Sequence, residues 1–376
     1  MISRVSVLNF KSLRDILVDL APLTVLTGLN GSGKSSLIQM LLLLRQNATA
    51  DGNPVEAELD KGFLRLGTQG DIRYCYNEGI DKAIVAVESD SLNADYKVEM
   101  AFDEPLGDTI TLRPSADCAF VPRKKELVEY IHGIQYISAE RGEPKQEHDY
   151  LPSKIKSKLW GEHGENAVAF LAEFGDHILV DEKMRNPLCS DPMLVAQVNA
   201  WLGVVSHGAT VNMKMNEALR KVELSFSFAT GVNKYLFRPQ NVGFGLSYVL
   251  SLLIMILTAH SGDCLILENP EAHIHPRGQA EIGRLISLAV SAGVQVIVET
   301  HSDHMLNGIR VAVKSGIIDR HSACIQFFSR VDHRSEQGLY EQYSVARKIE
   351  IDSNGELSEY PDDFMEEWDR QLKLLV

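Results

Sequence analysis

The sequence predicts an α/β protein with a parallel core sheet, an antiparallel β subdomain and a mostly helical insertion. In the C-terminal half, apolar strands alternate with helices, which is the order of a parallel sheet covered on both faces. Residues 63–112 contain short β-type stretches broken by Gly, Asn and Asp, as in an antiparallel sheet. Residues 146–222 are rich in helix formers. We therefore expect residues 1–145 and 223–376 to form one α/β domain, interrupted by a helical insertion at 146–222.

Local patterns define the elements in order. Residues 2–10 alternate apolar and polar side chains as a strand does, and a glycine-rich turn later joins an apolar strand to an apolar helix. The expected strands are 2–10, 16–20, 23–27, 83–87, 97–100, 134–138, 222–228, 234–238, 264–267 and 294–299. The expected helices include 35–46 and the apolar segment that ends at Leu257.

The composition limits the partners of the chain. The net charge of −14 over 376 residues argues against a general electrostatic binder of nucleic acid. The five cysteines are far apart and form no CxxC pair, which is typical of reduced cytosolic thiols. Residues 1–20 do not have the pattern of a signal peptide. The longest apolar run, residues 249–259, is shorter than the roughly 20 residues of a membrane span. We expect a cytoplasmic protein that does not bind membranes.

One motif predicts a phosphate site. The run Gly28-Leu29-Asn30-Gly31-Ser32-Gly33-Lys34-Ser35 fits GxxxxGK[ST] and lies between a predicted strand and a predicted helix. Glycines let successive backbone N–H groups curl around a phosphate, and the start of the helix adds partial positive charge. The Lys34 amine would reach the β- and γ-phosphates, and the Ser35 hydroxyl would ligate Mg²⁺.

Asn30 and the second serine, Ser36, make this run similar to the heads of ABC, SMC and RecF-like ATPases. The lead-in at residues 8–14 resembles the first segment of SMC- and RecF-like proteins. The resemblance implies an ABC-type P-loop NTPase head that binds ATP, with Lys11 and Arg14 close to the nucleotide. Further stretches resemble small bacterial AAA-15/OLD-like ATPases with a C-terminal domain of unknown function, similar to the ATPase of Septu-type antiphage systems. These stretches are 138–144, 161–166, 198–202 and 352–364.

An acidic strand end is the candidate Mg²⁺ and catalytic region. Residues 264–268 form an apolar strand that ends in Glu268, and a carboxylate at such a position binds Mg²⁺ through water. The following segment, up to Pro276, resembles the EPExHLHP segment of OLD-family and related defence ATPases, which have a second acid before the proline. Here Asn269 stands in its place and cannot accept a proton. The base that polarises the attacking water is therefore Glu271, Glu268 itself, or none.

Three further positions complete the candidate site. His301 ends a second apolar strand, can hydrogen-bond a γ-phosphate, and resembles the switch histidine of these families. Ser247 lies in a glycine turn before the apolar helix, where a serine can satisfy free N–H groups. This turn resembles a degenerate ABC signature, which implies that it receives the γ-phosphate of ATP bound to another copy. Gln69 is a candidate Q-loop ligand of Mg²⁺. Glu271, His273 and His275 are an alternative metal site, although no further ligand cluster is nearby.

These inferences predict an ATP-hydrolysing head that forms a homodimer or a higher even oligomer around ATP and Mg²⁺. The resemblance implies that the cycle controls an effector protein, such as a nuclease or toxin from the same operon. Asn269 leaves open a nucleotide-gated scaffold with negligible turnover that cages its partner. A RecF-like DNA-repair ATPase also stays open. The basic runs 123–125 and 154–158 are candidates for nucleic-acid contact, and residues 364–375 are expected to form a helix docked on the core.

Overall fold

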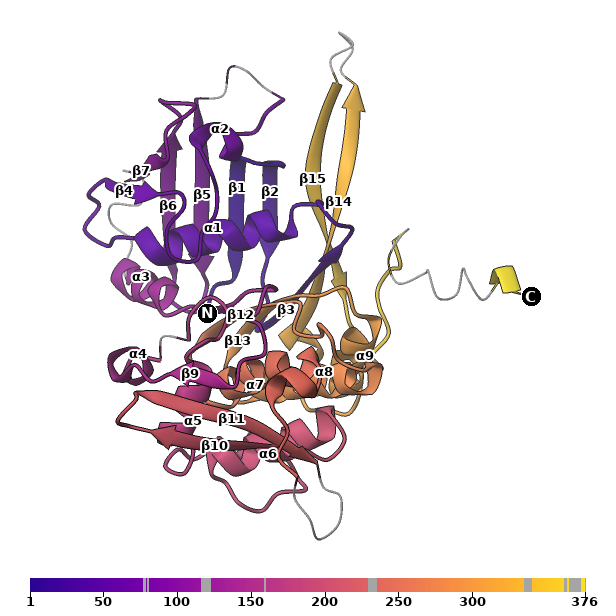
Figure 1. The fold of residues 1–376 in the computed structure, drawn as a ribbon. Coiled ribbons are helices and arrows are strands. Elements are labelled where there is room, and N and C mark those ends of the chain that lie inside the picture. The colour runs from indigo at the N-terminus through magenta and orange to yellow at the C-terminus, as the bar shows by residue number, and fades with distance from the viewer. Residues whose placement is uncertain are drawn as a thin grey trace. The chain divides into compact units, whose positions relative to one another are not determined.

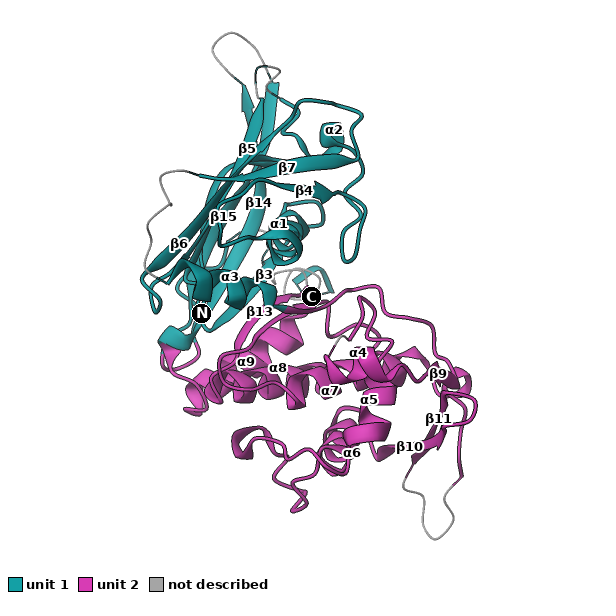
Figure 2. Ribbon diagram, turned by 90° about the vertical axis from the view of Figure 1, so that its left-hand side faces the viewer, with its two compact units in different colours: residues 1–134, 321–352, 356–376 teal, residues 135–320, 353–355 magenta. Residues whose placement is uncertain are grey.

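The computed structural model describes residues 1–76, 79, 81–115, 123–158, 160–228, 235–334, 340–361, 364 and 373–375. The chain divides into two compact units, shown in different colours in Figure 2. Unit 1 comprises residues 1–134, 321–352 and 356–376, and unit 2 comprises residues 135–320 and 353–355. The predicted domain boundaries at residues 145 and 222 divide the chain in a different way and stay predictions.

Unit 1 contains a six-stranded antiparallel sheet, as the sequence predicts for this region. Its strand order is β2-β1-β5-β6-β7-β4. Buried and exposed residues alternate along β5 and β6, because one face of the sheet is covered and successive side chains point to opposite faces. The strands are β1 (Arg4–Phe10), β2 (Leu13–Asp19), β4 (Val55–Glu58), β5 (Lys82–Ser89), β6 (Ala94–Ala101) and β7 (Thr109–Pro114).

A second group of strands in unit 1 supports the glycine-rich turn. Strand β3 (Leu23–Gly28) pairs in parallel with β14 (Ala323–Arg334), and β14 pairs with β15 (Tyr340–Glu350) in a long antiparallel hairpin. Figure 1 shows this hairpin in yellow beside β2. The helices of unit 1 are α1 (Lys34–Asn47), α2 (Gln69–Ile72) and α3 (Lys124–His132). Sequence analysis did not predict β14 or β15.

Unit 2 contains the parallel strands that the sequence predicts. Strand β12 (Cys264–Glu268) lies between β8 (Gln135–Ile137) and β13 (Gln295–Glu299), and both neighbours are parallel to it. The apolar helix is α7 (Phe244–Leu257), and its residues 249–257 are all buried, as expected for a core helix that is too short to span a membrane. The other helices are α4 (Pro152–Lys156), α5 (Ala167–Phe174), α6 (Leu194–Val205), α8 (Pro276–Ser291) and α9 (Asp303–Lys314).

The insertion carries helices α4, α5 and α6, and it also carries part of a three-stranded antiparallel sheet with the order β10-β11-β9. Sequence analysis predicted β11 (Lys221–Phe228) but neither β9 (Glu147–Asp149) nor β10 (Ala209–Asn216). The predicted strand at 234–238 is wrong within the described residues, because only Phe237 forms an isolated bridge, to Phe226. Residues 365–372 of the predicted C-terminal helix lie outside the described residues.

Within the described part of the chain, no helix is long and apolar enough to cross a membrane.

Candidate functional site

The glycine-rich turn has the backbone of a phosphate-binding loop. It joins the C-terminal end of β3 to the first residue of α1, and Gly28, Gly31 and Gly33 have φ values of 131°, 74° and 104°. Residues other than glycine rarely adopt such values. The first turn of α1 contains no acidic residue, so no side chain of that turn opposes the attraction of the helix dipole for an anion.

Side chains in the loop also fit a bound nucleotide. Lys34 is 3% exposed, and its Nζ donates to the carbonyl oxygens of Gly28 at 2.9 Å and Leu29 at 3.0 Å. Its amine is therefore held against the loop that would receive the phosphates. Ser32 Oγ is buried without a hydrogen-bond partner among the described residues. Ser35 and Asn30 are exposed and Ser36 is half-buried. Taken together, the positive backbone dihedrals, the helix start without acidic residues and the held amine suit an anionic phosphate group.

Lys11 and Arg14 make contacts inside unit 1. Lys11 Nζ donates to Gln39 Oε1 of α1 at 2.9 Å, and burial lowers the pKa of this amine. Arg14 pairs with Glu341 at 2.8 Å, and its guanidinium lies 3.9 Å from the centre of the Tyr343 ring. Arg14 is thus bound to the β14–β15 hairpin. A role for either residue beside a nucleotide stays a prediction.

Gln69 is the first residue of α2 and is 7% exposed. Its Nε2 donates to Thr109 O at 2.8 Å, and its Oε1 accepts from Glu104 N at 3.0 Å. Both ends of the amide therefore hold the segment between β6 and β7. As a Mg²⁺ ligand, Gln69 would have to give up the contact from Glu104, and this assignment stays a prediction.

In unit 2, Glu268 ends β12 as predicted and is held by hydrogen bonds to one carboxylate oxygen. Its Oε2 accepts from Tyr136 Oη at 3.1 Å and from Ala139 N at 3.2 Å. Burial, reinforced by the nearby Glu299 carboxylate, raises the pKa of Glu268 to about 7. The other oxygen, Oε1, makes no hydrogen bond to a described residue, so it is available to a ligand.

The turn after β12 places Glu271 against the turn after β13. Glu271 Oε1 accepts from the backbone N–H of His301 at 2.9 Å, and Oε2 is buried without a partner among the described residues. Asn269 has a φ of 42°, and its N–H donates to Glu299 O at 2.8 Å. His301 itself is exposed and immediately precedes Ser302, the N-cap of α9. Glu271 and His301 are therefore neighbours in space, although 30 residues separate them in sequence.

Sequence analysis missed three residues around Glu268. Arg141 is 4% exposed and donates from Nη2 to Glu268 O at 2.9 Å, and burial lowers its pKa to about 10. Tyr136 donates its hydroxyl to Glu268, and Glu299 lies directly opposite Glu268 on β13. Glu299 could have been found from the sequence, because it ends a predicted parallel strand just as Glu268 does.

Ser247 does not cap its helix, so that expectation is wrong. Helix α7 begins at Phe244 after Gly243, and Ser247 lies within the first turns with a buried Oγ that has no partner among the described residues. The helix therefore starts before the position expected for a cap at Ser247, and Gly245 in its first turn packs against the turn after β12. A Cβ on Gly245 would lie 2.3 Å from His273 O.

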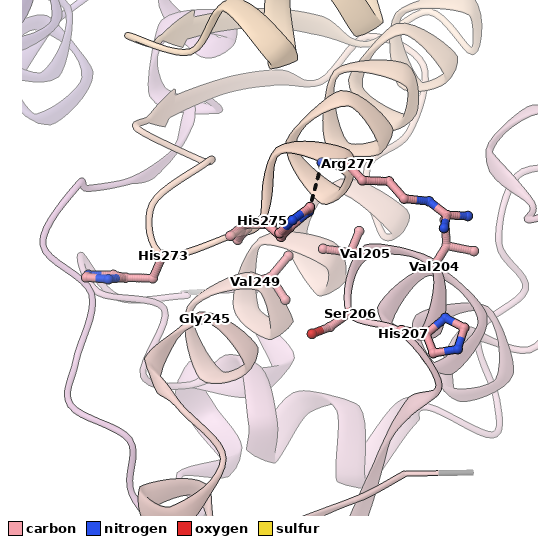
Figure 3. Close-up of a pocket in the computed structure, with 10 residues that line it drawn as sticks. Val204, Val205, Ser206, His207, Gly245, Val249, His273, His275 and Arg277 are labelled. Carbon is pink, nitrogen blue, oxygen red and sulfur yellow. Dashed lines mark hydrogen bonds between the residues drawn. The ribbon is translucent and has the colours of Figure 1, made fainter. Parts of the chain in front are cut away.

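A cavity of about 310 Å³ lies beside this helix start in unit 2 (Figure 3). Its lining includes His207, Gly245, Val249, His273, His275 and Arg277, and no carboxylate. The proposed alternative of a metal site from Glu271, His273 and His275 does not match this geometry. The Glu271 carboxylate meets His301, the His273 ring packs against Tyr248 at 5.0 Å, and His275 Nδ1 accepts from Arg277 N at 3.3 Å.

The two basic runs are partly occupied by contacts within their own units. Arg123 pairs with Glu126, and Lys158 Nζ donates to Thr258 O at 3.1 Å. Lys154 and Lys156 are exposed on α4. Contact of either run with nucleic acid stays a prediction.

Three known families match parts of the chain by sequence. "AAA ATPase domain" matches residues 1–163, "AAA domain, putative AbiEii toxin, Type IV TA system" matches residues 142–307, and "Protein of unknown function (DUF3696)" matches residues 318–375. None of the curated proteins matches the chain by sequence.

Solved structures of SMC heads share the fold. The Smc head domain with an extended coiled coil from Pyrococcus furiosus, bound to the C-terminal domain of ScpA, is 13% identical with a TM-score of 0.52, and the match covers 100% of this chain and 98% of that one. A second SMC head, bound to the C-terminal winged-helix domain of ScpA, is 14% identical with a TM-score of 0.50, covering 92% and 97%. The predicted ABC/SMC-type P-loop head fold is confirmed. The link to antiphage defence stays a prediction.

Proposed function

We propose that this P-loop head binds and hydrolyses ATP, and that ATP-dependent pairing of two copies controls an effector protein. The observation that carries the proposal is the loop at Gly28–Ser35, whose positive backbone dihedrals, non-acidic helix start and buried Lys34 suit a nucleotide phosphate. The acidic turns of unit 2 supply the groups that hydrolysis needs.

Each residue has a defined task in the proposal. The loop N–H groups and Lys34 bind the β- and γ-phosphates, and the Ser35 hydroxyl with Glu268 holds Mg²⁺. Mg²⁺ when bound neutralises charge on the phosphate oxygens. Glu268 suits this task because Tyr136 and Ala139 orient its carboxylate through Oε2 and leave Oε1 free of hydrogen bonds to described residues.

Glu271 is the proposed general base, because Asn269 has no basic site. Its Oε1 is held by the His301 N–H, which fixes the orientation of the carboxylate, and its Oε2 has no other described partner. A water bound at Oε2 would be polarised by the carboxylate. The same hydrogen bond ties the base to the turn that carries His301. A His301 side chain that contacts the γ-phosphate would therefore report the nucleotide state to Glu271.

The proposed partners are a second copy and an effector protein, such as a nuclease or toxin of an antiphage system. The SMC heads of the same fold are bound to ScpA, which supports a head of this kind carrying a protein partner. Ser247 would contribute to the site of the other copy. Its hydroxyl is buried without a hydrogen-bond partner among the described residues, and its place in the site of the other copy rests on the similarity of this turn to an ABC signature.

A nucleotide-gated scaffold is the second candidate function, and Glu271 favours it. One oxygen of this carboxylate is engaged by His301 and the residue is only 9% exposed, so access of water is restricted. Such a head would bind ATP, turn over slowly and hold its partner until ATP is depleted.

Steady-state ATP hydrolysis across a range of protein concentrations tests the proposal. Specific activity that rises with concentration is expected for a site completed by a second copy. Lys34→Ala is the reference variant and should abolish ATP binding in equilibrium dialysis, whereas the exposed Lys125→Ala should not. Bound ATP with a near-zero rate at every concentration would favour the scaffold. Tight ATP binding by Lys34→Ala would remove the P-loop assignment.

A further inference from the structure

The β14–β15 hairpin contacts the glycines of the P-loop. Phe328 of β14 is in register with Gly28, and a Cβ on Gly28 would lie 2.0 Å from Phe328 O. A Cβ on Gly33 would lie 2.6 Å from Ser344 Oγ of β15. Ser344 is fully buried, and its Oγ is 2.7 Å from Ser12 Oγ. The conformation of the loop is therefore fixed by its packing against this hairpin as well as by its own backbone dihedrals.

Arg330 makes the most direct contact with the loop. Its Nε donates to Gly31 O at 2.6 Å, and its Nη2 lies 3.3 Å from the position of a Cβ on Gly31. A P-loop binds phosphate with N–H groups that point inward, so its carbonyls must find partners on the outside. Arg330 provides such a partner, and its positive charge lies beside the loop that receives phosphate.

A chain of hydrogen bonds holds Arg330 in place. Its Nη1 donates to Gln342 Oε1 at 2.9 Å, and Gln342 Nε2 donates to Asp332 Oδ1 at 2.8 Å. Tyr340 Oη donates to the same oxygen at 2.8 Å. These two donors lower the pKa of Asp332, so the carboxylate is ionised and a strong acceptor. Arg330 is thus oriented by side chains of the hairpin itself.

We propose that Arg330 is a positioning residue for the nucleotide, and that the β14–β15 hairpin sets the affinity of the P-loop for phosphate. This inference rests on the proposed ATP binding. It assigns a role to the segment that matches a protein family of unknown function, because the hairpin lies within residues 318–375. The effect is one of preorganisation: a loop already held in its binding shape loses less conformational entropy when the phosphate arrives.

Equilibrium binding of Mg-ATP to the full chain tests the proposal. Arg330→Ala should bind ATP roughly tenfold more weakly, the value of one charge-assisted hydrogen bond. Arg330→Lys keeps the positive charge but has no planar guanidinium to donate to Gly31 and Gln342 at the same time. Its affinity for ATP should therefore be about threefold lower than that of the wild type. Arg334→Ala is the matched control, since Arg334 is an exposed arginine four residues further along β14, at the end of the strand away from Gly28. If the wild type hydrolyses ATP, Arg330→Ala should raise KM but leave kcat at saturating ATP unchanged, because in this proposal Arg330 affects the affinity for ATP and not the chemical step.

The outcomes separate this inference from the proposed function. A wild-type chain that does not bind ATP overturns the proposed function. ATP binding that Lys34→Ala abolishes and Arg330→Ala leaves unchanged overturns only the role of Arg330. Equal losses in Arg330→Ala and Arg334→Ala would mean a general charge effect and would also overturn it. If Arg330→Ala does not fold, Gln342→Ala decides: about threefold weaker binding supports the chain of hydrogen bonds, and unchanged binding overturns it.

Discussion

The phosphate loop of unit 1 and the acidic turns of unit 2 are built on different principles. The loop places its chemistry on the backbone, through three glycines with positive φ and the start of α1. The acidic turns place their chemistry on two carboxylates, and hydrogen bonds from distant residues fix each one. Tyr136 and Ala139 hold Glu268, and the His301 N–H holds Glu271.

This difference decides which substitutions are tolerated. A backbone site depends on residues whose main chain can adopt unusual dihedrals, so the addition of one methyl group can damage it. A carboxylate site depends on charge and on donors around it, so an isosteric amide preserves its shape but removes its chemistry. Four variants can break or sharpen this comparison.

The largest expected effect is that of Glu271→Gln on turnover. The amide oxygen can still accept from the His301 N–H, so the fold and ATP binding should be preserved. Because an amide is not a base at neutral pH, kcat should fall by about 10²-fold, the usual scale of positioned acid–base catalysis. Single-turnover hydrolysis with bound ATP measures this directly.

Glu281→Gln is the matched control for Glu271→Gln, since Glu281 lies on α8 and pairs with Arg284 at 3.3 Å. Its turnover should equal that of the wild type. Equal turnover in Glu271→Gln would return the role of base to Glu268, or leave water unassisted.

Gly33→Ala tests whether the loop is a backbone site. Gly33 has a φ of 104°, and the added Cβ would lie 2.6 Å from Ser344 Oγ. Relief of the strain and the clash must move the loop, so ATP binding should weaken roughly tenfold or more. Gly52→Ala is the control, because Gly52 has a φ of 78° but no atom within 4 Å of its Cβ position. Wild-type affinity in Gly33→Ala would contradict the assignment of the site to the backbone.

The loop could be predicted from the sequence because its function depends on local dihedrals. Gly28–Ser35 specifies strand, turn and helix within one short segment. The partners of Glu268 and Glu271 could not be predicted in this way, because they arise from the register of β8, β12 and β13. The β14–β15 hairpin was missed since its buried inner half and exposed outer half do not follow one alternating pattern. Ser247 was misplaced because α7 begins at Phe244, after Gly243, whose φ of 79° a serine rarely adopts.

Glu268→Gln tests how much the buried, ionised Glu268 carboxylate lowers the free energy of unfolding in the absence of nucleotide and Mg²⁺. The pKa of Glu268 is raised to about 7 from 4.5, so the folded protein binds this proton more tightly than the unfolded chain. The contribution of the protonated Glu268 carboxyl to the free energy of unfolding is complete below about pH 4.5 and is lost as the pH rises through about 7. Glu268→Gln does not titrate, so it should raise the free energy of unfolding at pH 8 by about 1–2 kcal/mol. Urea unfolding in EDTA between pH 5 and 8 measures this.

The gain in Glu268→Gln should shrink toward pH 5, where the wild-type carboxyl becomes protonated in the folded state. Glu281→Gln again serves as the control for the removal of one carboxylate from unit 2. Identical pH dependence in the wild type and Glu268→Gln would mean that the carboxylate is better solvated than its contacts indicate.

The smallest expected effect is that of Ser247→Ala, which separates stability from association. The Ser247 hydroxyl is buried without a partner among the described residues, so its removal should leave the single chain as stable or more stable by about 0.5–1 kcal/mol. If the hydroxyl serves the site of a second copy, ATP-dependent association in analytical ultracentrifugation should weaken. Ser251→Ala on the same helix is the control, because Ser251 Oγ already donates to Tyr248 O at 3.3 Å. A Ser247→Ala variant with unchanged association would make this serine a packing residue of α7, and the signature would then act through its backbone, as the phosphate loop does.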